Sequence, residues 1–281
     1  MKKIIVWLSL LMFLFLWNTS AVLATDNEES AYDRVIRTGK IRCGIMLWPP
    51  YFDKDPNTKE ITGLGADFYR GMADLIDLEI AYVEVVVGQQ VEDLRLGKID
   101  AVCNDGPYVF SAIKFVDYSK PAYYSPVFAY VRHDDPRFQN APDLNNPDVS
   151  IVVIDGDLGG PLSDRNFPKA RVVSLPAITD VASMLMNVVT KKADATIVDS
   201  YAVIHFNQNN PPGLRPLSES TPIAVYPVGF SVKKGETPLL NMLNAGIDAM
   251  WNTNSALPIL RKYDATGKAF FPVARPYEAP D

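Results

Sequence analysis

Three aspartates stand at or just after the ends of predicted buried strands, where their carboxylates could bind a cationic group. They are Asp105, Asp157 and Asp199. Ligands of open α/β sheets bind outside the carboxyl ends of the parallel strands. A desolvated carboxylate that faces an ammonium forms a charge-assisted pair, which is stronger than a neutral hydrogen bond. The positions therefore predict an acidic cleft. Asp157 and Asp199 also have a second interpretation, because each could cap a following helix.

Aromatic and amide side chains are expected in the same cleft. Trp48 follows the first predicted strand, and a Trp face attracts cations by about 0.5–2 kcal/mol, depending on desolvation. Asn104 ends another strand, and Tyr108 follows four residues later. Each has a purely structural alternative: Trp48 could pack beside two prolines, Asn-Asp-Gly is an ordinary turn sequence, and Tyr108 could only support its loop. We expect Trp48, Asn104, Asp105 and Tyr108 to contact a ligand.

The sequence carries no pattern typical of a metal, cofactor or catalytic site. Its two histidines, His133 and His205, are isolated from each other and from the cysteines, so we expect no zinc site. Acid–base catalysis could use the carboxylates, but no histidine or activated nucleophile accompanies them. We therefore expect a binding protein without a cofactor rather than an enzyme.

The composition is that of an exported globular protein. The 281 residues carry a net charge of −6 and no long basic run, so nucleic acid is not an expected partner. Lys2 and Lys3 precede an apolar run at 4–17, and small residues end at a cleavage site after Ala24. A signal anchor stays open, although the run is short for a span of about 20 residues. We expect signal peptide 1–24 to be removed and the rest of the chain to be exported.

Strands and helices alternate along the chain in two units. The predicted strands of the first unit are 40–46, 78–87 and 99–103, with helices at 65–76 and 89–96. The second unit has strands at 150–154, 171–175 and 193–198, with helices at 178–190 and 200–207. Segments 127–132 and 223–233 cross between the units, and helices at 239–251 and 255–262 follow. A βαβαβ order implies a mostly parallel sheet covered by helices on both faces.

The two cysteines, Cys43 and Cys103, lie in the first and third predicted strands. If the sheet order is 2-1-3, as in doubly wound folds, these strands are neighbours. Export would place both thiols in an oxidising compartment, where disulfides persist. We predict a disulfide between them; two buried thiols that act as small hydrophobic side chains are the alternative.

Two segments carry a resemblance to a known family. LRLGKIDAVCNDGPYVFSAIKFVDYSKPAYY (94–124) and KKADATIVDSYAVIHF (191–206) resemble the family 3 solute-binding proteins of ABC transporters. The spacing from Asp100 to Asp117 reproduces that of the family. The resemblance implies a two-lobed periplasmic binding protein of type II. One lobe would comprise 25–124 with 228–281, and the inserted lobe 125–227.

The resemblance also implies roles for single positions. In the family an Arg twelve residues after the strand Asp clamps the α-carboxylate of the ligand, and Ala112 stands there. The usual Thr three residues earlier is Val109. Asp157 replaces a Ser or Thr at the helix terminus that normally receives that carboxylate, whereas Asp199 matches the amine-binding carboxylate. The expected ligand is therefore cationic or neutral and polar, such as an amine.

Three functions are compatible with these residues. The leading hypothesis is a ligand-capture protein that closes by a hinge and delivers its small-molecule ligand to a membrane ABC permease. The second is an accessory protein without ligand, similar to family relatives associated with periplasmic quinoprotein dehydrogenases; the absent Arg and Tyr123-Tyr124-Ser125 fit it. The third is an enzyme similar to dehydratases on this scaffold.

Overall fold

A parallel βαβαβ unit opens the described part of the chain. The computed structural model describes residues 29–106, 110–210, 213–264 and 267–274, and the predicted signal peptide lies outside them. The elements of this unit are α2 (Ala31–Thr38), β1 (Lys40–Ile45), α3 (Leu64–Leu75), β4 (Glu79–Glu84), α4 (Gln90–Arg95) and β5 (Ala101–Asp105). β1 pairs in parallel with both β4 and β5. The 2-1-3 order predicted from the sequence is therefore confirmed.

The second unit repeats this arrangement with an antiparallel strand beside it. Its elements are β7 (Tyr123–Arg132), β8 (Ser150–Ile154), α5 (Gly159–Asn166), β9 (Arg171–Leu175), α6 (Val181–Val189), β10 (Ala195–Asp199), α7 (Ser200–Asn209) and β11 (Leu214–Pro216). β8 pairs in parallel with β9 and β10, and β10 pairs antiparallel with β7. The predicted start of a helix at 178 is wrong: α6 begins at Val181, because the Asp180 side chain caps it by accepting from Ser183 N.

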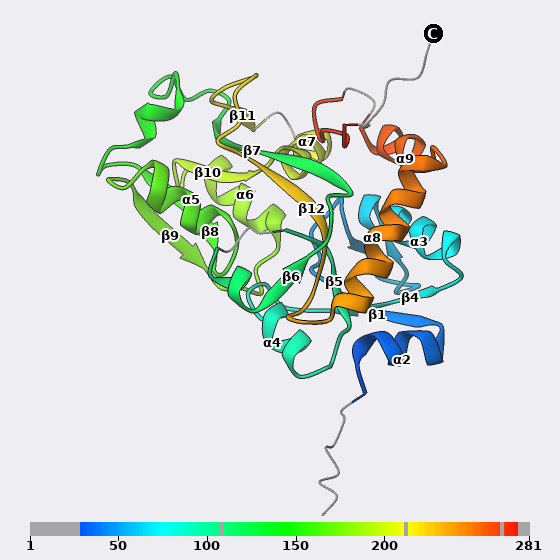
Figure 1. The fold of residues 1–281 in the computed structure, drawn as a ribbon. Helices are drawn as coiled ribbons and strands as arrows, with labels where there is room; N and C mark the ends of the chain where they lie inside the picture. The colour runs from blue at the N-terminus through cyan, green and yellow to red at the C-terminus, as the bar shows by residue number, and fades with distance from the viewer. Residues whose placement is uncertain (1–28, 107–109, 211–212, 265–266, 275–281) are drawn as a thin grey trace, which may run out of the picture. The chain divides into compact units, whose positions relative to one another are not determined.

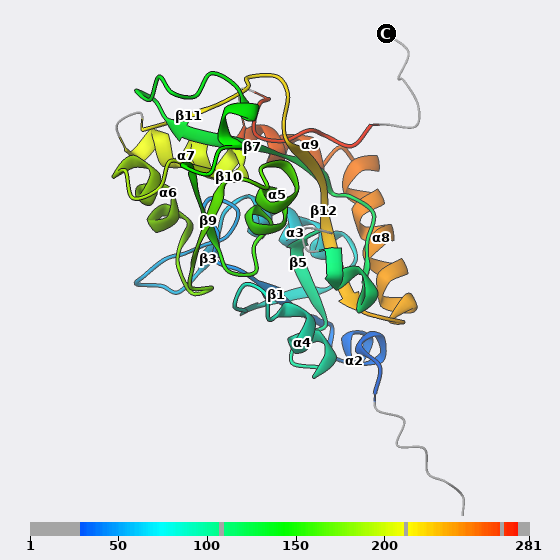
Figure 2. The same ribbon diagram turned by 90° about the vertical axis from the view of Figure 1, so that its left-hand side faces the viewer.

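Two long strands join the units into one sheet. β12 (Ala224–Lys233) pairs with β7 through residues 224–228 and with β5 and β6 (Val116–Tyr118) through its second half. The register shifts between Gly229 and Phe230, where β12 passes from one unit to the other. β7 and β12 run side by side through the centre of both views (Figures 1 and 2). The sheet order is β4-β1-β5-β12-β7-β10-β8-β9, which confirms the two-lobed α/β fold.

Separate hydrophobic cores lie under the two halves of this sheet. Helix α3 buries Phe68 and Met72 against β1 and against α8 (Thr237–Asn252), and α9 (Ala256–Tyr263) adds Leu260. Figure 1 shows α8 in orange next to α3 in cyan. Two other clusters, on opposite faces of the second unit, form around Val131 with Ile151 and around Met184 with Val188. We refer to these halves as the first and second lobes; the boundaries at 124/125 and 227/228 stay a prediction.

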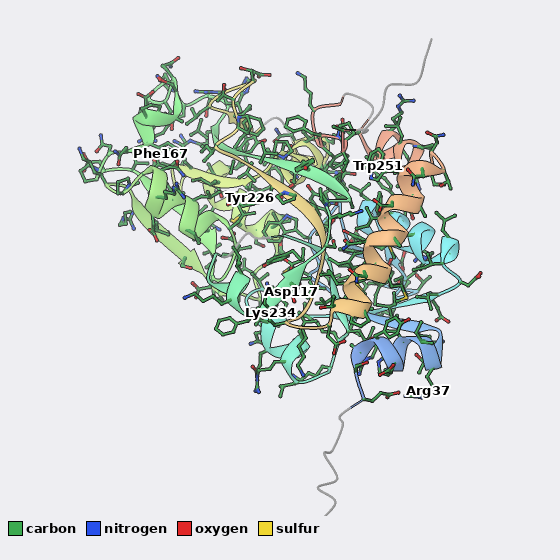
Figure 3. The ribbon with its side chains drawn as sticks, in the orientation of Figure 1. Arg37, Asp117, Phe167, Tyr226, Lys234 and Trp251 are labelled. Atoms are coloured by element: carbon green, nitrogen blue, oxygen red, sulfur yellow. A yellow bond between two sulfur atoms is a disulfide. The ribbon has the colours of Figure 1, made fainter. Side chains whose placement is uncertain are left out.

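Four short elements lie outside the two units. β2 (Asp53–Lys54) and β3 (Ile61–Thr62) form a small hairpin, and short 3₁₀ turns occupy η1 (Phe110–Lys114) and η2 (Ala141–Leu144). Asp117 on β6 pairs with Lys234, just after β12, and the two labels lie together in Figure 3.

No described helix is both long and apolar enough to cross a membrane.

Cys43 and Cys103 form a disulfide between β1 and β5, with their Cα atoms 5.7 Å apart. The predicted bridge is confirmed, and the alternative of two buried thiols is wrong. Because Cys103 directly precedes Asn104 and Asp105, the bridge fixes the strand end that carries two of the predicted site residues.

Candidate functional site

One pocket gathers five of the six predicted site residues. Trp48, Asn104, Asp105, Asp157 and Asp199 all line it. Tyr108, the sixth, lies outside the described residues. The pocket is formed by the carboxyl ends of β1, β5, β8 and β10 and by the loops that follow them. It thus lies between the two lobes, at the sheet edge where open α/β folds bind ligands.

Asp105 brings a buried carboxylate to the first-lobe side of the pocket. It accepts hydrogen bonds from Gly106 N at 2.8 Å and from the hydroxyl of Ser231, which lies on the neighbouring strand β12. Burial raises the pKa of Asp105 from 3.8 to about 6, against the lowering effect of these two donors. At neutral pH the carboxylate is therefore mostly ionised.

Asp157 lies opposite, in the loop that leads from β8 into α5. Its carboxylate accepts from the backbone N–H groups of Ile154 at 3.2 Å, Gly159 at 2.8 Å and Gly160 at 3.4 Å. The capping interpretation thus describes its contacts, and the side chain lines the pocket as well. Burial again raises the pKa, to about 6. The N–H groups at the start of α5 consequently bind an acid of the chain itself, where an anionic ligand would meet repulsion.

Asp199 connects the second lobe to the first. One oxygen accepts from Ala202 N at 2.9 Å and caps α7, and the other accepts from Trp48 Nε1 at 3.0 Å. Burial raises the pKa of Asp199, while Ala202, Trp48 and Tyr51 oppose the shift. Trp48 therefore offers its indole N–H to a carboxylate of the protein.

The remaining first-lobe residues are held by specific backbone and side-chain contacts. Asn104 has a positive φ of 60°, which Asn tolerates better than most residues, and its Oδ1 accepts from the hydroxyl of Tyr123. Tyr51 contacts Ser125 Oγ through its hydroxyl at 3.2 Å and lines the pocket, as Tyr118 does. The sequence prediction selected residues that directly follow strands of the predicted sheet, and it did not include these two tyrosines. Tyr51 lies in a proline-broken loop, and Tyr118 lies on β6.

Apolar side chains and a second amide also line the pocket. The apolar ones are Met46, Phe52, Val87, Val91, Cys103, Ala112 and Leu158. The amide is Gln90, at the start of α4; its Oε1 is buried and has no hydrogen-bond partner among the described residues. Sequence reasoning centred on strand ends could not distinguish Gln90 from its exposed neighbour Gln89.

The described residues that line the pocket include three aspartates and no Lys, Arg or His. Ala112 is among them, so the position that the resemblance assigns to a carboxylate clamp faces the pocket with a methyl group. The three carboxyl groups consequently have no cationic partner among the described lining residues. Such an arrangement favours a cationic group over an anionic one.

A family model decides what this chain is related to. The model of the bacterial extracellular solute-binding proteins, family 3, matches residues 41–266. The chain belongs to this family. That membership agrees with the predicted export, because the family acts outside the cytoplasm.

Individual relatives of this family 3 protein are distant. A "Probable histidine-binding protein" from Campylobacter jejuni is 20% identical over 240 residues, which cover 85% of this chain and 90% of the relative. A crystal structure of an ancestral amino acid-binding protein, described as a precursor of cyclohexadienyl dehydratase, is 24% identical with a TM-score of 0.72. It covers 84% of this chain and 99% of its own. A mutant of ArgBP from T. maritima is 21% identical with a TM-score of 0.71, covering 84% and 99%. These structures establish a shared fold.

Proposed function

We propose that this protein captures a small ligand in the periplasm and delivers it, as a monomer, to a membrane ABC permease. Family membership supports the capture role. A structure described as the substrate binding protein of an amino acid ABC transporter has a TM-score of 0.70 to this chain, at 19% identity, and covers 81% of it and all of its own chain. It supports the permease partner. We assign a ligand that is cationic or neutral and polar, an amine or an amine-like relative of an amino acid.

The observation that carries this ligand class is the charge of the cleft. Asp105, Asp157 and Asp199 are buried in the pocket, and the described lining contains no cation. An α-carboxylate bound there would be desolvated next to like charge, at a cost of several kcal/mol. Each 1.4 kcal/mol lowers affinity about tenfold, so an ordinary α-amino acid would lose micromolar binding.

Titration calorimetry with the exported form of the protein tests the proposal. The ligands are primary amines, arginine, histidine and neutral amino acids. We expect an amine to bind at least about tenfold more tightly than the amino acid with the same side chain, because one unpaired charge costs more than 1.4 kcal/mol. Micromolar binding of a plain α-amino acid would contradict the assignment.

A second candidate function is an accessory protein that keeps the fold without transport. The contacts of Asp157 and Asp199 favour it, because the backbone and Trp48 already provide donors to both carboxylates. Calorimetry that finds no metabolite, together with co-purification of a periplasmic dehydrogenase, would support this function. A turnover assay addresses the dehydratase alternative.

A further inference from the structure

Gln90 has a buried acceptor that no described residue satisfies. Its Oε1 atom has no hydrogen-bond partner in the part of the chain that the structure describes, although the side chain lines the pocket. A buried acceptor without a donor is unfavourable, because the atom has lost its hydration without gaining a partner. Such a group requires an explanation, and a ligand in the pocket can supply the missing donor. Because the free atom is an acceptor, the expected partner is an N–H or O–H of the ligand.

Asp105 is the pocket carboxylate with the most free acceptor capacity on the same lobe. An ionised carboxylate has about four lone-pair sites, and the described contacts of Asp105 use one site on each oxygen, for Gly106 and Ser231. Asp157 by contrast accepts from three backbone N–H groups, and Asp199 accepts from Ala202 N and Trp48 Nε1 and has a further hydrogen bond with Tyr51. A cation that enters the pocket therefore meets its least occupied carboxylate at Asp105.

Most of the remaining lining is apolar. Met46 and Val91 come from the first lobe, Leu158 from the second, and none of them offers a polar atom to a ligand beyond the backbone. A ligand with several hydroxyl or carboxyl groups would lose hydration without gaining partners there. An apolar body instead gains about 25 cal/mol for each Å² of surface removed from water.

From these three observations, we propose that the pocket binds a primary amine carried on an apolar body. The ammonium donates to Asp105 and to Gln90 Oε1, and the apolar body lies against Met46, Val91 and Leu158. This inference rests on the proposed ligand-capture function and names its substrate class. In this arrangement the first lobe selects the amine. The resemblance to the family gives no role to Gln90 in ligand binding.

Calorimetry at pH 7.5 with three matched probes tests the inference. The probes are 2-phenylethylamine, ethanolamine, which keeps the amine without the apolar body, and phenylalanine, which adds a carboxylate. We expect 2-phenylethylamine to bind about 30-fold or more tightly than ethanolamine, since burial of several apolar carbons contributes about 0.8 kcal/mol each. Phenylalanine should bind more weakly than 2-phenylethylamine.

Two variants identify the residues that hold the ammonium. Gln90→Leu and Asp105→Asn should each weaken 2-phenylethylamine about tenfold or more, as expected for a lost hydrogen bond to a charged group. Gln89→Leu is the matched control, because Gln89 is exposed and outside the pocket lining. It should leave the dissociation constant unchanged, and circular dichroism verifies that all three variants are folded.

The failures of the two proposals are distinguishable. If none of the amines binds, or phenylalanine binds as tightly as 2-phenylethylamine, the proposed ligand class itself is wrong. If ethanolamine binds as tightly as 2-phenylethylamine, or Gln90→Leu behaves like Gln89→Leu, amine capture stands and the present inference is overturned.

Discussion

The indole Nε1 of Trp48 donates to Oδ2 of Asp199 at 3.0 Å, although the two residues are 151 positions apart in the chain. Trp48 follows β1 in the first lobe, and Asp199 ends β10 in the second. The bond therefore crosses the pocket and holds the two lobes together. Leaving a buried acceptor without its donor costs about 1–3 kcal/mol, so this one contact weighs substantially in the balance between open and closed lobes.

We predict that Trp48→Phe opens the cleft. The phenyl ring keeps most of the apolar contact but has no N–H, so Asp199 loses its donor from the other lobe. The radius of gyration from small-angle X-ray scattering should rise, and the free energy of unfolding should fall by about 1–3 kcal/mol, because a buried carboxyl oxygen loses its donor.

Trp251→Phe is the matched control for this prediction. Trp251 on α8 donates its Nε1 to Ala122 O at 3.0 Å, within the first lobe (Figure 3). Its loss should lower stability without changing the radius of gyration. An unchanged radius for Trp48→Phe, measured beside this control, would show that the indole bond does not hold the lobes.

A second contact between the lobes involves two glycines. Gly156, in the loop after β8, lies so close to Gly88, after β4, that a Cβ on Gly156 would be 3.1 Å from Gly88 Cα. Both residues have a φ of +83°, which β-branched residues rarely adopt. The backbones of the loops after β4 and β8 are therefore in direct contact at this side of the pocket.

We predict that Gly156→Val separates these loops. Strain at the positive φ costs about 1–3 kcal/mol, and the added side chain has no space against Gly88. Scattering should detect an opened cleft, and urea unfolding should show the lost stability. Gly160→Ala is the control, since a Cβ there meets no atom within 4 Å. Equal effects of the two substitutions would contradict the contact.

The sequence predicted the sheet well, and it placed three aspartates at strand ends, for a physical reason. Consecutive βαβ units bring the carboxyl ends of the parallel strands within one lobe to one edge, so Asp157 and Asp199 share an edge of the second lobe and Asp105 lies at the corresponding edge of the first. The disulfide followed from the same order, because Cys43 and Cys103 are on adjacent strands.

Contacts made by loops were not accessible to such reasoning. Nothing in the sequence relates Trp48 to Asp199 as bonding partners, because their distance depends on how two lobes are placed. Gln90 and Tyr51 reach the pocket from a short helix and a proline-broken loop, where neighbours in sequence point in different directions. The helix expected at 178 begins later, because the Asp180 side chain caps it by accepting from Ser183 N. Several residues near this point could have served as the cap, and the sequence did not show which one does.

Asp157 should make the protein less stable as the pH rises. Its pKa is raised from 3.8 to about 6 by burial, with a smaller contribution from Asp155. Between these pH values the folded state binds more protons than the unfolded state, so the free energy of unfolding falls with rising pH and the penalty is complete above about pH 6. A shift of about two units corresponds to roughly 3 kcal/mol.

We predict that Asp157→Asn stabilises the protein at pH 7.5 by about 1–3 kcal/mol and has little effect at pH 4, because the amide still accepts from Gly159 without carrying a charge. Urea unfolding at the two pH values measures the difference. Asp157→Ala, which removes the cap as well, should gain less. A loss of stability for Asp157→Asn at both pH values would refute this account.

Binding of a cation at Asp105 should weaken in acid. The pKa of Asp105 is raised to about 6, and the tyrosines that face it, Tyr69 and Tyr118, have pKa values raised by burial and stay protonated. Protonation removes the charge that attracts an ammonium. The dissociation constant of 2-phenylethylamine should therefore increase as the pH falls through 6, about tenfold for each unit below it when the bond requires the ionised form. A constant affinity between pH 7.5 and 5 would contradict this dependence.

Reduction of the Cys43–Cys103 disulfide should destabilise the protein strongly. The bridge closes a loop across 60 positions, for which the chain-entropy model gives about 4 kcal/mol. Urea midpoints with and without dithiothreitol measure the effect, and a thiol assay on denatured, unreduced protein should find no free thiol. The Cys43→Ser/Cys103→Ser variant is the control: the chain has no other cysteine, so dithiothreitol should leave its midpoint unchanged.

Because Cys103 also lines the pocket beside Asn104 and Asp105, the reduced protein should bind its ligand less tightly even in conditions where it remains folded. Unchanged affinity after reduction would limit the bridge to a role in stability.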